Sequence, residues 1–262
     1  MKQRIITALV AGIIFLGIVV YGAMPFTILV YLLASVALYE LLRMKNIQIT
    51  SSLGFIGLLF LWLLMIKDDI LYASPIVTFT KIELALIVVL VLLSITVLSK
   101  NRFTFDDVGF IILSVVYIGV GFYYFIETRE RGLDYVIYAL FVIWSTDTGA
   151  YFVGRSLGKR KLWPKISPNK TIEGSIGGIV FALLTAVIFQ LVHPLHSSMM
   201  IVILITILAS ITGQIGDLVE SAFKRHYVVK DSGTILPGHG GILDRFDSLL
   251  FVLPVLHFVH FI

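Results

Sequence analysis

Hydrophobic residues gather along this chain into long blocks that are separated by short polar segments. A membrane-spanning helix needs roughly 20 mostly apolar residues, within a range of about 17–25. On that rule the pattern predicts nine spanning helices, at Ile5–Tyr21, Pro25–Leu42, Leu53–Ile66, Ile82–Leu98, Val108–Ile126, Tyr135–Val153, Ser175–Val192, Met199–Gly216 and Ser248–Ile262. The third and ninth are short, so we expect them to be less tilted, extended at their ends or partly interfacial.

The composition supports a membrane protein. Of the 262 residues 58% are hydrophobic and 14% are charged, and the mean hydropathy is +1.00, whereas soluble domains have about a quarter charged residues. The absence of cysteine excludes disulfides and thiolate metal sites. The apolar N-terminal stretch lacks a small-residue cleavage site, so we expect a retained helix. The predicted fold class is an all-α, polytopic integral membrane protein.

Basic residues are distributed unevenly between the two sides of these predicted spans. If the spans alternate in direction, 16 of the 20 Lys and Arg residues fall on one side. Because cytoplasmic loops are enriched in Lys and Arg, we expect the N-terminus and the polar loops 154–174 and 224–247 to be cytoplasmic, in a multi-pass protein of the cell membrane. We expect the lipid bilayer, and no nucleic acid, as a partner.

Polar residues are concentrated in the second half of the chain. The spans within residues 1–130 carry few polar groups beyond Glu40, whereas polarity rises sharply within residues 131–262. We therefore predict an N-terminal half that serves as a scaffold and a C-terminal half that carries the chemistry.

One acidic residue lies well inside an apolar segment, in WSTDTGAYFVGRSLGK. Asp147 would cost several kcal/mol there unless it is paired or hydrated. It could satisfy a neighbouring helix, or it could face a polar cavity in which Thr146, Thr148 and Tyr151 supply further hydrogen-bonding groups.

A basic loop follows, GRSLGKRKLWPKISPNKTIEGSIGG. Its charges could simply be attracted to anionic lipid headgroups. However, Ser167 and Pro168 are typical of a helix start, with Ser as the cap and Pro at the first helical position. Lys170 and Thr171 would then lie near free backbone N–H groups, which suits phosphate binding.

The eighth apolar block ends in ITGQIGDLVESAFKR. If the helix continues, Asp217, Ser221 and Lys224 share one face, and Glu220 lies partly off it. The carboxylate and the lysine could form only a weak surface pair. Alternatively, Asp217 could bind a cation while Lys224 contacts phosphate.

The ninth block is preceded by turn-forming residues and by ILDRFD. Asp244 and Asp247 are three residues apart, so both can project from one side of a first helical turn, although acidic residues also merely favour such a position. Together with Asp217 they form an all-oxygen set that suits Mg²⁺. His239, in PGHGG, could bind phosphate or brace the turn.

The whole stretch SAFKRHYVVKDSGTILPGHGGILDRFD, from Ser221 to Asp247, resembles the signature of the phosphatidate cytidylyltransferase family, also called CDP-diacylglycerol synthases. SPNKTIEGSIGG is similar to that family's SPxKTxEG segment, with Asn169 and Ile172 where a basic residue and a tryptophan are more usual. WSTDTGAYFVGRSLG is similar to its aspartate-containing sixth helix.

This resemblance implies a reaction in which CTP and phosphatidate yield CDP-diacylglycerol and pyrophosphate, with Mg²⁺ as the cofactor. It implies three groups of site residues. The metal ligands would be Asp217, Asp244 and Asp247, with a second cation and a homodimer left open, and Lys224 would be catalytic beside them. The substrate-binding residues would be Ser221, Arg225, Lys230, His239, Lys170 and Asp147.

Two alternatives would use similar residues. A CTP-dependent polyprenol kinase would transfer the γ-phosphoryl group and release CDP instead of pyrophosphate. A membrane transporter would use an intramembrane charge such as Asp147 as part of an ion path, but its polar groups should gather near the midplane. The DGxxAR motif of the CDP-alcohol phosphotransferases is absent.

Overall fold

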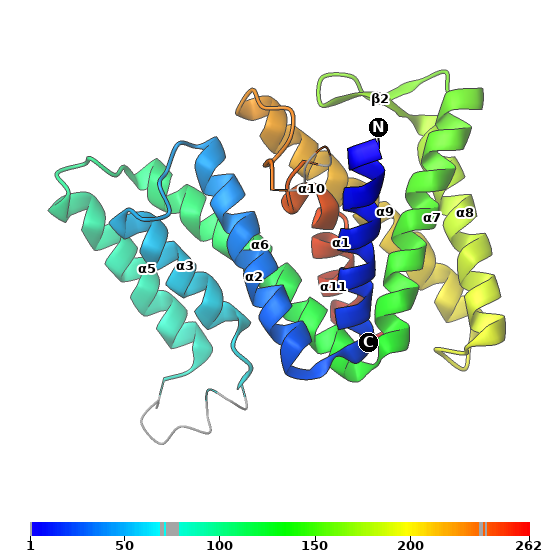
Figure 1. Cartoon of the computed structure of the whole chain (residues 1–262), viewed down its shortest axis with the longest axis horizontal. Coiled ribbons are helices and arrows are strands. Elements are labelled where there is room, and N and C mark those ends of the chain that lie inside the picture. Colours follow the sequence, from blue (N-terminus) through cyan, green and yellow to red (C-terminus); the bar gives the residue numbers. More distant parts are fainter. Residues whose placement is uncertain (1, 69–70, 72–78, 236–237, 239) are drawn as a thin grey trace.

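A computed structural model describes residues 2–68, 71, 79–235, 238 and 240–262, with side chains from Val10 onward. Long helices run obliquely between the upper and the lower side of the molecule in Figure 1. The helices are α1 Lys2–Tyr21, α2 Ala23–Met44, α3 Ser52–Met65, α5 Lys81–Leu98, α6 Phe105–Arg131, α7 Leu133–Leu157, α8 Ile172–Val192, α9 Met199–His226, α10 Leu243–Phe246 and α11 Leu249–Phe258. Two short strands, β1 Lys161–Trp163 and β2 Ser167–Thr171, form a hairpin between α7 and α8. The predicted all-α class is confirmed.

Each predicted apolar span overlaps one of these helices. Within the described residues, six helices are long and apolar enough to cross a membrane, namely α2, α5, α6, α7, α8 and α9. The described apolar segments Val10–Tyr21 of α1, Ser52–Met65 of α3 and Leu249–Phe258 of α11 are shorter, so the number of nine spans stays a prediction. The last helix ends at Phe258, four residues before the end of the predicted span.

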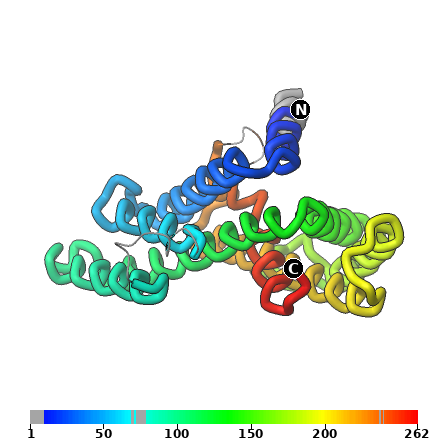
Figure 2. The backbone as a smooth tube through the Cα atoms, turned by 90° about the horizontal axis from the view of Figure 1, so that it is seen from below, coloured from blue at the N-terminus to red at the C-terminus, as the bar shows by residue number. Residues whose placement is uncertain are grey.

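The helices form two groups with the C-terminal segment between them. In Figure 1, α2, α3, α5 and α6 lie on the left, α7 and α8 lie on the right, and α10 and α11 lie in the middle, while α9 runs from the top middle to the lower right. Figure 2 shows α1 at the edge of the molecule. Because α11 packs against α6, α7 and α9, it joins the two groups.

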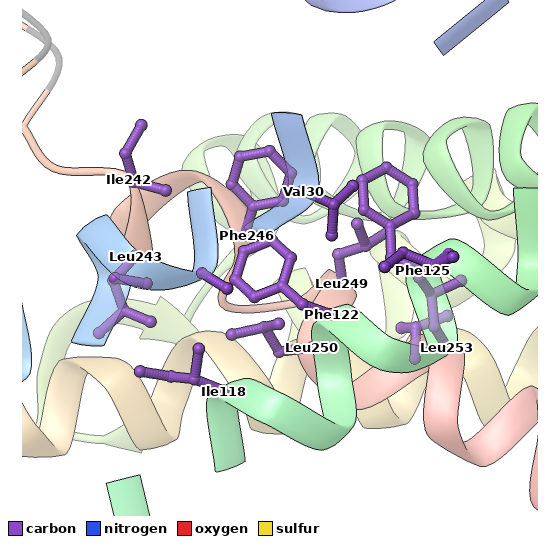
Figure 3. Close-up of a cluster of buried hydrophobic side chains, with 14 of the residues drawn as sticks. Val30, Ile118, Phe122, Phe125, Ile242, Leu243, Phe246, Leu249, Leu250 and Leu253 are labelled. Atoms are coloured by element: carbon purple, nitrogen blue, oxygen red, sulfur yellow. The ribbon is translucent and has the colours of Figure 1, made fainter. Parts of the chain in front are cut away.

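An aromatic and aliphatic core lies where these groups meet (Figure 3). Phe246 of α10 packs against Phe122 and Phe125 of α6, with ring centroids 5.5 and 6.2 Å apart. Gly121 of α6 lies directly against Leu250 of α11, where a Cβ atom would overlap the leucine. Residues from both predicted halves of the chain therefore share one core, and this core fixes α10 in place.

The start of α8 differs from the prediction. Residues 167–171 form strand β2, which pairs antiparallel with β1, and α8 begins at Ile172 with Thr171 as its cap. The Thr171 hydroxyl accepts a hydrogen bond of 3.1 Å from the Gly174 N–H. The helix start at Ser167 and Pro168 was therefore wrong, because pairing with β1 satisfies this backbone before a helix can begin.

Candidate active site

The polar side chains of the second half meet at one end of the helices. The β1–β2 hairpin, the C-terminal end of α9 and α10 all lie at the upper end in Figure 1. Helix α9 has 28 residues and is therefore about 42 Å long, whereas a bilayer's hydrocarbon core is about 30 Å thick. Its last turns can therefore extend beyond the apolar layer, where charged groups can be hydrated.

A cavity of about 460 Å³ opens between α7, α8, α9 and β2. This volume lies in the range of about 300–1,000 Å³ that is usual for small-ligand sites. Its charged and polar lining includes Asp147, Arg155, Lys170, Gln214 and Asp217. The structure thus places Asp147 at a polar cavity, which is one of the two alternatives left open for it.

Asp217 is held between two of the predicted site residues. Lys170 of β2 lies 2.5 Å from its Oδ2 atom, and the Ser221 hydroxyl donates a hydrogen bond of 3.3 Å to its Oδ1 atom. The second contact confirms that Asp217 and Ser221 share a face of α9. The first shows that Lys170 reaches the cavity from strand β2, directly before the N-terminus of α8, which begins at Ile172.

Asp247 faces the same acidic region. Burial, the charge of Asp217 and the charge of Asp147 raise the pKa of Asp247 to about 7, against the opposing hydrogen bond from the Ser248 N–H. Gly216 allows the main chain at Asp247 to lie close to α9, because a Cβ atom at Gly216 would be 2.5 Å from the main-chain oxygen of Asp247. The carboxylates of Asp147, Asp217 and Asp247 therefore interact electrostatically.

Asp244 has different partners. Its Oδ1 atom accepts a hydrogen bond of 2.7 Å from Lys224, which also forms an ion pair with the fully buried Glu220. Its Oδ2 atom accepts hydrogen bonds of 2.8 Å from the Gly241 N–H and 2.9 Å from both the N–H and the hydroxyl of Ser232. Burial alone would raise the pKa of Asp244, but its interactions with Glu220, Lys224 and these donors outweigh burial and hold it below its ordinary range.

The three predicted metal ligands do not form one cluster in this arrangement. Across the described ranges, no group of three His, Asp or Glu side chains is close enough to hold a metal ion. Asp217 and Asp247 nevertheless supply hard oxygen donors near one another, and Mg²⁺ keeps several waters and needs few protein ligands. All three carboxylates already accept hydrogen bonds, but Asp244 accepts the most, from four donors, so Asp217 and Asp247 fit Mg²⁺ better than Asp244 does.

Of the remaining predicted residues, the structure describes Arg225 and Lys230. Arg225 donates a hydrogen bond of 3.1 Å to the Ile166 main-chain oxygen and so ties α9 to the hairpin. Lys230 is exposed beyond α9 and has no ion pair within the described residues. His239 lies outside the described residues.

Sequence reasoning missed two residues of this site. Glu220 is predicted to lie partly off the functional face, yet its side chain is fully buried beside Lys224. Ser232 was read only as part of a turn, yet it contacts Asp244 through both its N–H and its hydroxyl. The signal available for Glu220 was its i,i+4 spacing to Lys224.

Comparisons with known proteins identify the family of this chain. Residues 2–262 match the family described as "Cytidylyltransferase family". The chain is 60% identical over 262 residues to "Phosphatidate cytidylyltransferase" of Bacillus subtilis (strain 168), covering 99% of this chain and 97% of that protein. It is 50% identical over 257 residues to the protein of the same name from Staphylococcus epidermidis (strain ATCC 12228 / FDA PCI 1200), covering 98% of each. The chain belongs to the cytidylyltransferase family.

Proposed function

We propose that this chain is a phosphatidate cytidylyltransferase, which converts CTP and phosphatidate to CDP-diacylglycerol and pyrophosphate. The observation that carries the proposal is the ion pair of Asp217 with Lys170 in the lining of a cavity at one end of apolar helices, with the Asp247 main chain packed against Gly216, next to Asp217. The relatives named phosphatidate cytidylyltransferase support the choice of substrates.

In the proposed reaction a phosphate oxygen of phosphatidate attacks the α-phosphorus of CTP. A new phosphorus–oxygen bond forms there, the bond from the α-phosphorus to the bridging oxygen breaks, and pyrophosphate leaves. Both reactants are anionic, so catalysis depends on positioning them and neutralising their charge. Lysines and a cation beside the cavity are suited to this task.

Asp217 and Asp247 would hold Mg²⁺, and Asp244 is the third proposed ligand, available only if it exchanges part of its present hydrogen bonding. Bound Mg²⁺ would neutralise phosphate charge and orient the phosphates. Lys170 already shows that Asp217 accepts a positive charge at its Oδ2 atom. The binding of a second cation remains part of the proposal for the same acidic region.

The basic and hydroxyl groups have proposed roles toward phosphate. Lys224, Arg225 and Lys230 would bind the triphosphate or stabilise the departing pyrophosphate, while Ser221 and His239 would position phosphate groups. Lys170 would contact phosphatidate or the nucleotide, and Asp147 would organise the polar cavity that it lines. All of these groups come from a single chain, so the proposal does not require a homodimer.

The site is proposed to face the cytoplasm, where CTP is available. The distribution of Lys and Arg supports this orientation, because the hairpin and the end of α9 carry many of them. Phosphatidate would reach the site from the bilayer around the helices.

Product analysis tests the proposal. Purified protein in detergent is incubated with CTP, phosphatidate and Mg²⁺, and we expect CDP-diacylglycerol with an equal amount of pyrophosphate. Release of CDP with a phosphorylated lipid would indicate a kinase instead. No product across phosphatidates of varied chain length would contradict the proposed function.

A further inference from the structure

A buried carboxylate from the first half of the chain lies next to the proposed site. Glu40 is in the last turns of α2 and is only 1% exposed. Both its burial and its place near the negative end of a helix are unfavourable for an acidic side chain. Such a group persists only where hydrogen-bond donors compensate for the lost water.

Three donors of the segment 232–243 supply this compensation. Oε1 of Glu40 accepts a hydrogen bond of 2.9 Å from the Ile242 N–H. Oε2 accepts hydrogen bonds of 2.9 Å from the Leu243 N–H and 3.0 Å from the Ser232 hydroxyl. The two N–H groups belong to the start of α10, where helical N–H groups have no partner within the helix.

The same segment leaves room for this carboxylate. A Cβ atom at Gly233 would overlap the Glu40 side chain, and a Cβ atom at Gly241 would overlap both Glu40 and the Ser232 hydroxyl. Gly233 and Gly241 therefore both lie directly against the Glu40 side chain. Within the described part of the chain Glu40 forms no ion pair, so its contacts with this segment are its main compensation.

Ser232 connects Glu40 to Asp244. Its hydroxyl oxygen lies 3.0 Å from Oε2 of Glu40 and 2.9 Å from Oδ2 of Asp244. A hydroxyl has one hydrogen, so it bridges the two carboxylates and donates to one of them at a time. The Asp244 N–H also points to this hydroxyl, at 3.3 Å.

We infer that Glu40 is a positioning residue for the reaction: it holds Ser232 and the start of α10 so that Asp244 stays aligned with Lys224. The inference rests on the proposed function for its effect on catalysis, because Glu40 itself contacts only protein groups. A displacement of about 1 Å at a reacting centre can lower a rate by about 100-fold. Loss of Glu40 should therefore lower kcat more than it raises either KM.

The test compares Glu40→Gln with a matched control. Gln keeps the size of the side chain but replaces one acceptor oxygen by an NH₂ group. Whichever oxygen is replaced, the NH₂ group would face a donor, namely the Ile242 N–H at Oε1 or the Leu243 N–H at Oε2. Tyr138→Phe is the control, because it removes another buried hydrogen bond, the 2.7 Å bond between the hydroxyls of Tyr138 and Thr206. Tyr138 lies in the N-terminal part of α7, which begins at Leu133. Glu40→Asp keeps the charge on a shorter side chain and replaces the Gln variant if that variant does not fold.

We expect Glu40→Gln to lower kcat by about 10- to 100-fold while each KM changes by less than about threefold. Tyr138→Phe should lower thermal stability with kcat within twofold of wild type. A kcat of Glu40→Gln within twofold of wild type, or a loss of kcat that merely tracks lost stability in both variants, would overturn the inference.

Two further measurements separate the inference from the proposed function. Hydrogen exchange at the amides of Ile242 and Leu243 should be faster in Glu40→Gln and unchanged in Tyr138→Phe, and this readout does not depend on turnover. In an active enzyme, Ser232→Ala combined with Glu40→Gln should lower kcat no more than the stronger single variant. Unchanged exchange or additive losses would overturn it, whereas an inactive wild type contradicts only the proposed function.

Discussion

Replacing Gly177 of α8 by Ala should disturb the proposed site from a distance. Helices α7 and α8 approach closely at this glycine, and a Cβ atom there would lie 2.5 Å from both Cβ and Cγ2 of Val153. Ordinary contact begins at 3.4 Å, so the groups must move apart by 0.9 Å. The branched Val153 side chain has one preferred rotamer in a helix and cannot turn away easily.

The neighbouring contacts make this movement costly. A Cβ atom at Gly178 would lie 2.7 Å from the Thr146 main-chain oxygen, so the two backbones are already close at the next position. Overpacking of this kind costs about 1–3 kcal/mol. At roughly 2–4 °C per kcal/mol for a chain of this size, the apparent Tm should fall by about 2–12 °C.

The same movement should lower activity. Lys170 lies in β2 immediately before α8, and Asp147 lies on α7, so a separation of these helices changes the cavity between them. We expect a fall in kcat of about 10- to 100-fold for Gly177→Ala in the fraction that remains folded. Thermal unfolding in detergent and the rate of CDP-diacylglycerol formation measure the two effects.

Gly109→Ala in α6 is the matched control, because a Cβ atom there has nothing within 4 Å. Ala is better than Gly inside a helix by about 0.5–1 kcal/mol, so this variant should keep or raise the Tm and keep its activity. A Gly177→Ala protein with wild-type Tm and rate would refute the argument that the close approach of α7 and α8 sets the geometry of the cavity.

Three further predictions concern the charged groups. Asp244→Asn should abolish turnover in folded protein, since Lys224 loses a charged partner at 2.7 Å, and near-normal activity in the purified variant would exclude a catalytic role. Lys170→Met should lower kcat at least about 10-fold, because it removes the positive charge beside Asp217. Steady-state rates at varied CTP and phosphatidate measure this against wild type, and unchanged kinetics would remove Lys170 from the proposal. Removal of divalent cations with EDTA should stop turnover, and added Mg²⁺ should restore it. The Asp247→Asn variant should require a higher Mg²⁺ concentration than wild type. A rate that survives EDTA would argue against a metal.

Most of the helices could be predicted from the sequence because the apolar blocks are local features. The predicted spans and the helices differ mainly at their ends. Helix α9 continues to His226, ten residues past the predicted span end at Gly216, because the hydropathy pattern follows the apolar layer and not the helix. The α11 helix is shorter than its apolar block, which turns after Phe258.

The hairpin shows why local signals were insufficient at the start of α8. Ser167 with Pro168 was an acceptable helix start by composition, yet α8 begins at Ile172. The later start depends on the pairing of β2 with β1 and on Glu173, which accepts hydrogen bonds of 3.0 and 3.1 Å from the Lys159 and Arg160 N–H groups. No helix-start rule includes a strand partner several residues upstream.

The same reasoning explains which part of the site was predictable. Asp217 and Ser221 are four residues apart on one helix, so their contact follows from helical spacing. The contacts of Glu40 with Ser232, Ile242 and Leu243 span 192, 202 and 203 residues, and no spacing rule covers such distances. An acidic residue in an apolar block does indicate a need for donors, but only the fold identifies them. Glu40 therefore gives the N-terminal half a role beside the proposed chemistry, which its apolar sequence did not suggest.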